Sequence, residues 1–189
     1  NNMLNINAII YNYGTIEIKG SLNLNSGATL VNALPTSVII NNNINNQTYL
    51  NGTFVNNGTA SFYNLQTNGS GKVYLGDGSV TTIANNWGND AINGWVVNNS
   101  AVVSYSGNAT FNQPLTTSTN INVCKSPTAT GTVTGSATVS SNCTNYCDLS
   151  LVPQVTKDTT IIIGITHQLK EFIIMKKMEL KYIQLTIEI

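Results

Sequence analysis

Short alternations of hydrophobic and polar residues, broken by Asn, Gly and Ser, run through most of this chain. Ile16 and Ile18, and then Leu22 and Leu24, are each separated by a single polar residue. A period of two places successive side chains on opposite faces of a β-strand, and a helical period does not fit runs this short. Pairs such as Asn57-Gly58 tolerate positive φ and predict tight turns. The pattern therefore predicts an all-β protein of very short strands.

Part of the pattern repeats along the chain. The segment Tyr11 to Ile16 (YNYGTI) recurs 44 residues later as VNNGTA from Val55 and, more loosely, a further 42 residues on as VNNSAV from Val97. Ser26 to Leu30 matches the segment from Ser70 at the same offset of 44. An offset of this size divides into two coils of about 22 residues with three strands each, the size of one turn of a parallel β-helix. We therefore predict a parallel β-helix (β-solenoid), with a β-sandwich that uses Asn-Gly turns as the alternative.

Asparagine dominates the composition, with 30 Asn, all of them before Cys147. In a β-solenoid, Asn residues at equivalent corners stack, and their amides repeat the backbone hydrogen-bond pattern as an Asn ladder. Charge is scarce: 8 Lys and no Arg stand against 8 Asp plus Glu, for a net charge of zero. So few cations leave little to neutralise phosphates, and we expect no nucleic-acid partner. No stretch approaches the roughly 20 apolar residues of a membrane-spanning helix.

The repeated segments, Tyr11 to Ile16 and Val55 to Thr59, together with the SGATL segment from Ser26, resemble the repeats of large secreted bacterial adhesin-like proteins. The resemblance covers about residues 7–113. It implies a right-handed β-helix of the passenger type, a secreted or cell-surface address, and an elongated scaffold in adhesion or surface structure. Surface glycans or other cell-surface proteins would then be the partners. We expect a fragment of a longer protein, whose open solenoid ends permit self-association.

Composition divides the chain into three regions. Residues 1–113 carry the repeats and predict the solenoid. Residues 114–150 predict a Ser/Thr-rich β module or linker, because Ser or Thr occupies every even position from Thr128 to Ser140, as in a long strand or a hairpin bent at Gly131 or Gly135. Residues 151–189 hold nine of the sixteen charged residues and no Asn. We expect this dissimilar tail to be disordered or non-native.

The three cysteines, Cys124, Cys143 and Cys147, fall close together. In an exported protein they predict a disulfide from Cys124 to Cys143 or to Cys147, and three unpaired thiols are the alternative. Structural zinc sites ordinarily use four Cys or His ligands, but the only His, His167, lies in the tail. We therefore expect no metal site.

No catalytic constellation emerges from the sequence. Glycoside hydrolysis ordinarily needs two carboxyl groups about 5 to 10 Å apart, whereas Asp77 and Asp90 are thirteen residues apart, out of step with the coil. We predict neither an enzyme nor a cofactor, and keep a polysaccharide-active β-helix enzyme as the least favoured alternative. The stronger alternative to a scaffold is a carbohydrate-binding module, in which Trp87 and Trp95 stack on sugar rings. Asn85-Asn86 and Gly88 flank Trp87 and make it the more exposed candidate of the two, although a core or cap position is the favoured interpretation for such aromatic residues.

Overall fold

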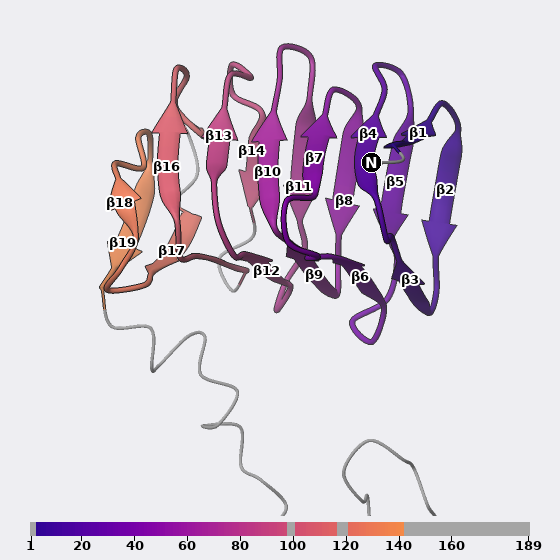
Figure 1. Cartoon of the computed structure of the whole chain (residues 1–189), viewed down its shortest axis with the longest axis horizontal. Helices are drawn as coiled ribbons and strands as arrows, with labels where there is room; N and C mark the ends of the chain where they lie inside the picture. Colours follow the sequence, from indigo (N-terminus) through magenta and orange to yellow (C-terminus); the bar gives the residue numbers. More distant parts are fainter. Residues whose placement is uncertain (1–2, 98–100, 117–120, 142–189) are drawn as a thin grey trace, which may run out of the picture. The chain divides into compact units, whose positions relative to one another are not determined.

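The structure, a computed structural model, describes residues 3–97, 101–116 and 121–141 of the 189-residue chain. These residues wind into a β-solenoid of about six turns, spaced about 21 residues apart, in which each full turn adds one strand to each of three sheets (Figure 1). No described residue is helical. The predicted parallel β-solenoid is therefore confirmed, and the β-sandwich alternative is excluded.

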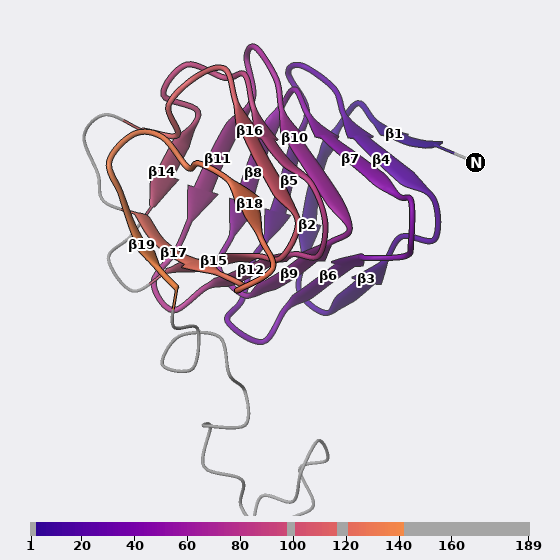
Figure 2. The same ribbon diagram turned by 60° about the vertical axis from the view of Figure 1, so that its left-hand side comes forward.

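The described residues form nineteen strands in three sheets. In spatial order, sheet A contains β1 (Met3–Ile6), β4 (Ser21–Leu24), β7 (Gln47–Leu50), β10 (Asn64–Thr67), β13 (Trp87–Asn89), β16 (Asn108–Phe111) and β18 (Thr130–Gly131). Sheet B contains β14 (Trp95–Val97), β11 (Lys72–Leu75), β8 (Thr53–Asn56), β5 (Thr29–Asn32) and β2 (Ile9–Asn12). Sheet C contains β19 (Ala137–Ser140), β17 (Ile121–Lys125), β15 (Val102–Tyr105), β12 (Val80–Ile83), β9 (Thr59–Phe62), β6 (Val38–Asn41) and β3 (Thr15–Glu17). All pairs are parallel, and Figure 2 shows the strands of sheet B side by side.

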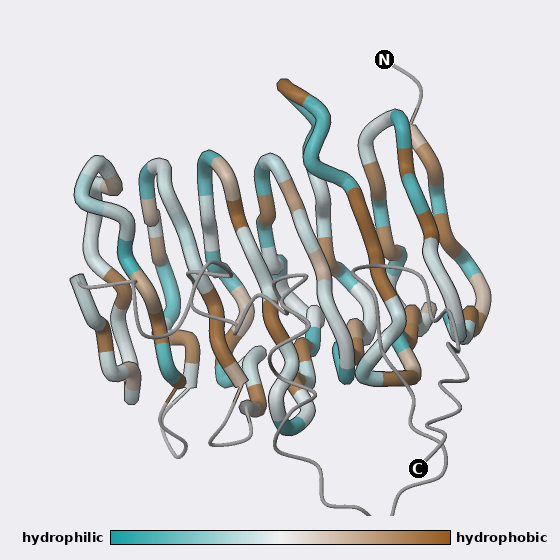
Figure 3. Tube along the Cα trace, turned by 90° about the horizontal axis from the view of Figure 1, so that it is seen from below, coloured by the Kyte–Doolittle hydropathy of each residue, from teal (hydrophilic) through white to brown (hydrophobic). Residues whose placement is uncertain are grey.

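The core consists of inward side chains that stack in columns along the solenoid. In Figure 3, hydrophobic and hydrophilic positions alternate along the turns. This alternation in the sequence is the reason that hydrophobic side chains point inward. Two of these columns are Leu22, Thr48, Leu65 and Trp87 in sheet A and Leu30, Phe54, Val73 and Trp95 in sheet B. Because parallel pairing keeps the faces in register, each turn buries its apolar residues against those of its neighbours.

The connections between strands vary in length, and this variation shifts the register of the repeat from one solenoid turn to the next. Gly14 and Gly58 do occupy equivalent corners two turns apart, with Ser37 between them: Val38 N–H bonds to Gly14 O at 2.8 Å, and Thr59 N–H to Ser37 O at 3.0 Å. Elsewhere the offset read from the sequence repeat differs by one residue from the offset between structurally equivalent positions. The residue equivalent to Val55 near the third copy, for example, is Val96 and not Val97. Tyr74 pairs with Val55 on one side and with Val96 on the other.

Residues 121–140 continue the solenoid. β17 pairs in parallel with β15, β19 pairs in parallel with β17, and β18 extends sheet A beside β16. The hairpin expected between Thr128 and Ser140 does not form. Instead Gly131 and Gly135, at φ of 79° and 101°, help the chain through another turn. Cys143, Cys147 and the tail expected at 151–189 lie outside the described residues.

Candidate functional site

A buried Asn ladder follows the corner between sheets B and C. Asn12 Nδ2 donates to Asn32 Oδ1 at 2.8 Å, and Asn32 Nδ2 donates to Asn56 Oδ1 at 2.8 Å. Thr81 ends the run by accepting from Asn56 Nδ2 at 3.1 Å. This confirms the predicted ladder. Because these amides are buried and bonded to one another, their role is structural, not ligand binding.

The two tryptophans predicted to contact sugars lie in the core. Trp87 is 0% exposed and Trp95 is 1% exposed, with their ring centroids 5.3 Å apart. Trp95 Nε1 donates to Thr67 Oγ1 at 3.2 Å. The core interpretation is therefore confirmed and the glycan contact of Trp87 is contradicted, because the register places this residue in the inward column of Leu65. Neither indole reaches a ligand in solvent.

The acidic side chains of the described residues lie apart. Asp77 is in the turn from sheet B to sheet C, and Asp90 is in the turn from sheet A to sheet B, where it accepts a hydrogen bond from Asn112 Nδ2 at 2.7 Å. Glu17, on sheet C, pairs with Lys19. The two aspartates therefore occupy different corners of the solenoid. Within the described ranges no group of three His, Cys, Asp or Glu residues is arranged to hold a metal ion.

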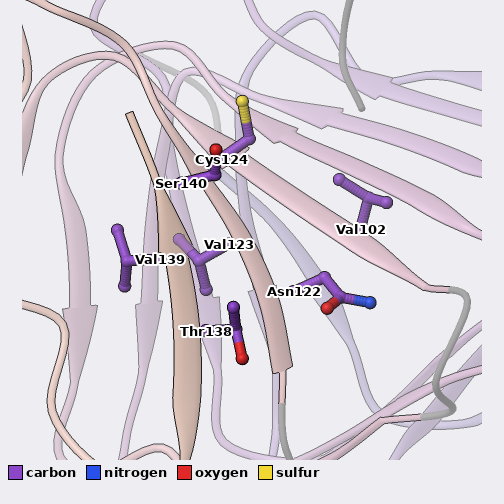
Figure 4. A pocket seen from close by; sticks show the side chains of 7 residues that line it. All are labelled: Val102, Asn122, Val123, Cys124, Thr138, Val139 and Ser140. Carbon is purple, nitrogen blue, oxygen red and sulfur yellow. The ribbon is translucent and has the colours of Figure 1, made fainter. Parts of the chain in front are cut away.

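A hollow of about 310 Å³ opens over β17 and β19, and Figure 4 shows the seven side chains that line it. They are Val102, Asn122, Val123, Cys124, Thr138, Val139 and Ser140. Cys124 is in register with Ser140 and is 1% exposed, although it belongs to the outward row of sheet C. These side chains include hydroxyls and an amide but no carboxylate, imidazole or amine, so they offer no acid–base pair for catalysis.

The outer surface of sheet B carries an exposed aromatic and aliphatic face. We call it the tyrosine face; it comprises Ile9, Tyr11, Thr29, Val31, Thr53, Val55, Lys72, Tyr74 and Val96 of sheet B, together with Tyr13, which follows β2 where sheet B turns into sheet C. Tyr11 is 59% exposed and Tyr13 is 64% exposed; their rings are nearly parallel, at 17°, with centroids 6.4 Å apart. Tyr74 is 41% exposed three strands away. The alternation of hydrophobic and polar residues did not predict this face, because Ile9, Ile10 and Tyr11 are consecutive.

A chain of amides borders the tyrosine face where sheet A turns into sheet B. Asn68 Nδ2 donates to Asn51 Oδ1 at 3.1 Å, Asn51 Nδ2 to Asn23 Oδ1 at 2.8 Å, and Asn23 Nδ2 to Asn5 Oδ1 at 3.0 Å. A side branch runs from Asn23 through Asn25 to Asn7. We call these six residues the corner amides. They give the exposed corner a continuous row of neutral donors and acceptors.

No protein-family model, curated protein or solved structure matches this chain. What the structure establishes is the class of fold, a parallel β-solenoid built from repeats. The part of the chain that is described contains no helix long and apolar enough to cross a membrane.

Proposed function

We propose that this chain is a fragment of an exported cell-surface structural or adhesive protein and acts as an elongated scaffold. The observation that carries the proposal is the continuous stacking of about six turns through three parallel sheets. Adjacent strands lie about 4.8 Å apart, so six turns extend the solenoid by roughly 30 Å. Repetition of the same contacts in each turn would give such a scaffold length and stiffness.

The Asn ladder supports a mechanical role. Each rung joins one turn to the next through side chains, in addition to the backbone bonds of the sheets. Separating two turns would therefore break a backbone ladder in each sheet and leave buried amides without partners. Unpaired buried polar groups cost about 1 to 3 kcal/mol each, which favours a stack that resists being pulled apart.

We also propose a disulfide between Cys124 and Cys143 or Cys147, as export would permit. Cys124 is buried although it lies on an outward row of sheet C, and this burial supports its use in a structural disulfide. Peptide mass mapping without reduction tests the pairing, and we expect one cross-linked peptide that contains Cys124. Alkylation of all three thiols in the folded, unreduced protein would contradict it.

The separation of Asp77 and Asp90 supports binding over catalysis. A glycosidase of the usual kind brings two carboxyl groups to one sugar linkage. We therefore expect the purified chain to release no reducing ends from neutral or acidic polysaccharides. Measurable turnover by the chain would instead favour the alternative of a polysaccharide-active enzyme.

Surface labelling tests the scaffold proposal. Antibodies raised against the purified chain should label intact cells of the source as strongly as permeabilised ones, and particles coated with the chain should adhere to such cells. Label that appears only after permeabilisation would exclude a surface address, whatever the chain binds.

A further inference from the structure

We propose that the tyrosine face binds a neutral polysaccharide; this inference rests on the proposed surface scaffold and names its ligand class. The face carries three exposed aromatic rings: Tyr11 on β2, Tyr13 directly after β2, and Tyr74 on β11, three strands away. Phenol rings pair an apolar face with a polar tip, which suits the C–H surface and hydroxyl rim of a sugar ring.

The two neighbouring tyrosines form a preformed platform. Tyr11 is an outward residue of β2, Tyr13 directly follows the end of that strand, and their rings lie within 17° of parallel with centroids 6.4 Å apart. A platform that exists before binding costs little side-chain entropy when a ligand settles on it. This arrangement favours stacking of a sugar ring on the two phenol rings over an aromatic cage that forms around the ligand only on binding.

The surroundings of the rings supply hydrogen bonds to hydroxyl groups. Thr29 and Thr53 occupy the adjacent outward row of sheet B at successive strands, and the corner amides lie beyond them. Hydroxyl and amide groups both donate and accept, as vicinal sugar hydroxyls also do. An aliphatic protein segment would offer the threonine hydroxyls no donor or acceptor, whereas a sugar chain offers both.

Charge decides between neutral and acidic polymers. Lys72 is the only charged residue of the tyrosine face, and its Nζ donates to the backbone oxygens of Ile92 and Asn93, at 3.4 and 3.3 Å. A polymer of uronates would find no array of cations here, and neither would a surface of anionic lipid. The face therefore fits a neutral chain.

The spacing of the face indicates a polymer. Tyr11 and Tyr74 are separated by three strand intervals, roughly 14 Å at the usual strand spacing. Thr or Val side chains continue the surface across the strands between them. A single sugar ring would cover one end only, whereas an extended chain contacts both.

Retention of the purified chain on polysaccharides tests the proposal. The probes are cellulose and chitin particles and gels that contain mannan, xylan or β-glucan, with polygalacturonate and phosphatidylcholine vesicles for comparison. We expect at least one neutral polymer to retain the chain, and Tyr11→Ala/Tyr13→Ala to weaken this at least tenfold, equivalent to about 1.4 kcal/mol. Tyr11→Phe/Tyr13→Phe should keep most of the retention, because its rings still stack.

Tyr63→Ala is the matched control, because Tyr63 is half-buried and lies between β9 and β10, where sheet C turns into sheet A, away from sheet B. It should leave retention unchanged. Far-UV circular dichroism and thermal unfolding check the fold, and Tyr74→Ala, on another strand, gives an independent variant that should also weaken retention. The proposal is overturned if no neutral polymer retains the chain, if only polygalacturonate or vesicles do, or if folded tyrosine variants bind as the native chain does. None of these results bears on surface labelling, which decides the scaffold proposal separately.

Discussion

The side-chain nitrogen of Asn32 donates a hydrogen bond to the side-chain oxygen of Asn56, 2.8 Å away and 24 residues later in the chain. The same nitrogen lies 3.0 Å from Ser37 O in its own turn and 3.1 Å from Thr59 O in the next turn. Asn32 is fully buried and also accepts from Asn12. One side chain therefore links three successive turns.

Replacement of Asn32 tests how much this link contributes. Asn32→Ala removes the shared donor and the acceptor, and leaves buried oxygens of Asn56 and Ser37 with fewer partners. We expect the free energy of unfolding to fall by about 2 to 4 kcal/mol. Urea denaturation measures it. The exposed Asn42 is the control, and Asn42→Ala should change stability by no more than about 0.5 kcal/mol.

Two glycines of the repeat should respond differently to the same substitution. A Cβ on Gly58 would lie 2.3 Å from Ser37 O and 2.5 Å from Leu34 O, whereas a Cβ on Gly14 meets nothing within 4 Å. We expect Gly58→Ala to destabilise the protein by about 1 to 3 kcal/mol and Gly14→Ala to be nearly neutral. Denaturant midpoints compare the two. Equal effects would mean that the close stacking of turns at Gly58 does not hold.

The repeat predicted the fold because its members occupy equivalent corners. Asn12 and Asn56 are two rungs of one ladder, and the Gly two residues after each donates its N–H to the Asn side-chain oxygen, at 3.0 and 3.1 Å. Such an Asn-x-Gly corner is a local device that the sequence displays directly. An offset of two turns was therefore visible without any structure.

Register and exposure were harder to predict. The turn between β5 and β6 contains five residues, 33–37, whereas Tyr63 alone separates β9 from β10. A shift of one residue moves a side chain to the other face of a strand, so the burial of Trp87 did not follow from its neighbours. Ile9, Ile10 and Tyr11 are all apolar, so alternation gave no sign of which of them face outward.

Burial of Tyr105 predicts a loss of stability in alkali. The phenol is in the core, with its ring centroid 5.6 Å from that of Trp87, and desolvation raises its pKa above 10.0. Above pH 10 the unfolded chain therefore releases this proton while the folded chain retains it, and the free energy of unfolding falls by up to about 1.4 kcal/mol per pH unit. Below the unfolded pKa this contribution is fully present.

Tyr105→Phe isolates the effect. Urea denaturation of both proteins at about pH 8 and about pH 11 should show a smaller alkaline loss for the variant, because Phe has no proton to release. Lysine deprotonation affects both proteins and cancels in the comparison. An equal alkaline loss in the two proteins would mean that the Tyr105 hydroxyl is solvated.

The first turn of the solenoid predicts self-association of the purified chain. Leu4 is 47% exposed, whereas Leu22, its partner in the next turn, is 0% exposed. In the described structure β1, β2 and β3 each pair on one side only, with β4, β5 and β6. Unpaired strands beside apolar residues are a template for pairing with another chain.

Hydrogen bonding in the Asn ladder also indicates that the first turn is the surface through which chains associate. Asn56 Oδ1 accepts from both Asn32 Nδ2 and Gly58 N, but among the described residues the equivalent oxygen of Asn12 accepts from Gly14 N alone. The first turn therefore keeps an acceptor where a further turn would supply a donor. We expect sedimentation velocity to show larger species as the protein concentration rises.

Charge at the first turn should suppress this association. Leu4→Lys with Ile16→Lys places two cations among the open edges, and natural proteins use lysine on edge strands to prevent such pairing. The matched control is Ile44→Lys, in the loop between β6 and β7, where Ile44 is 76% exposed. The double variant should sediment as a monomer at concentrations where the control still associates, since only the former changes the unpaired edge. A native chain that stays monomeric throughout, or a control as monomeric as the double variant, would show that the first turn is not the contact surface.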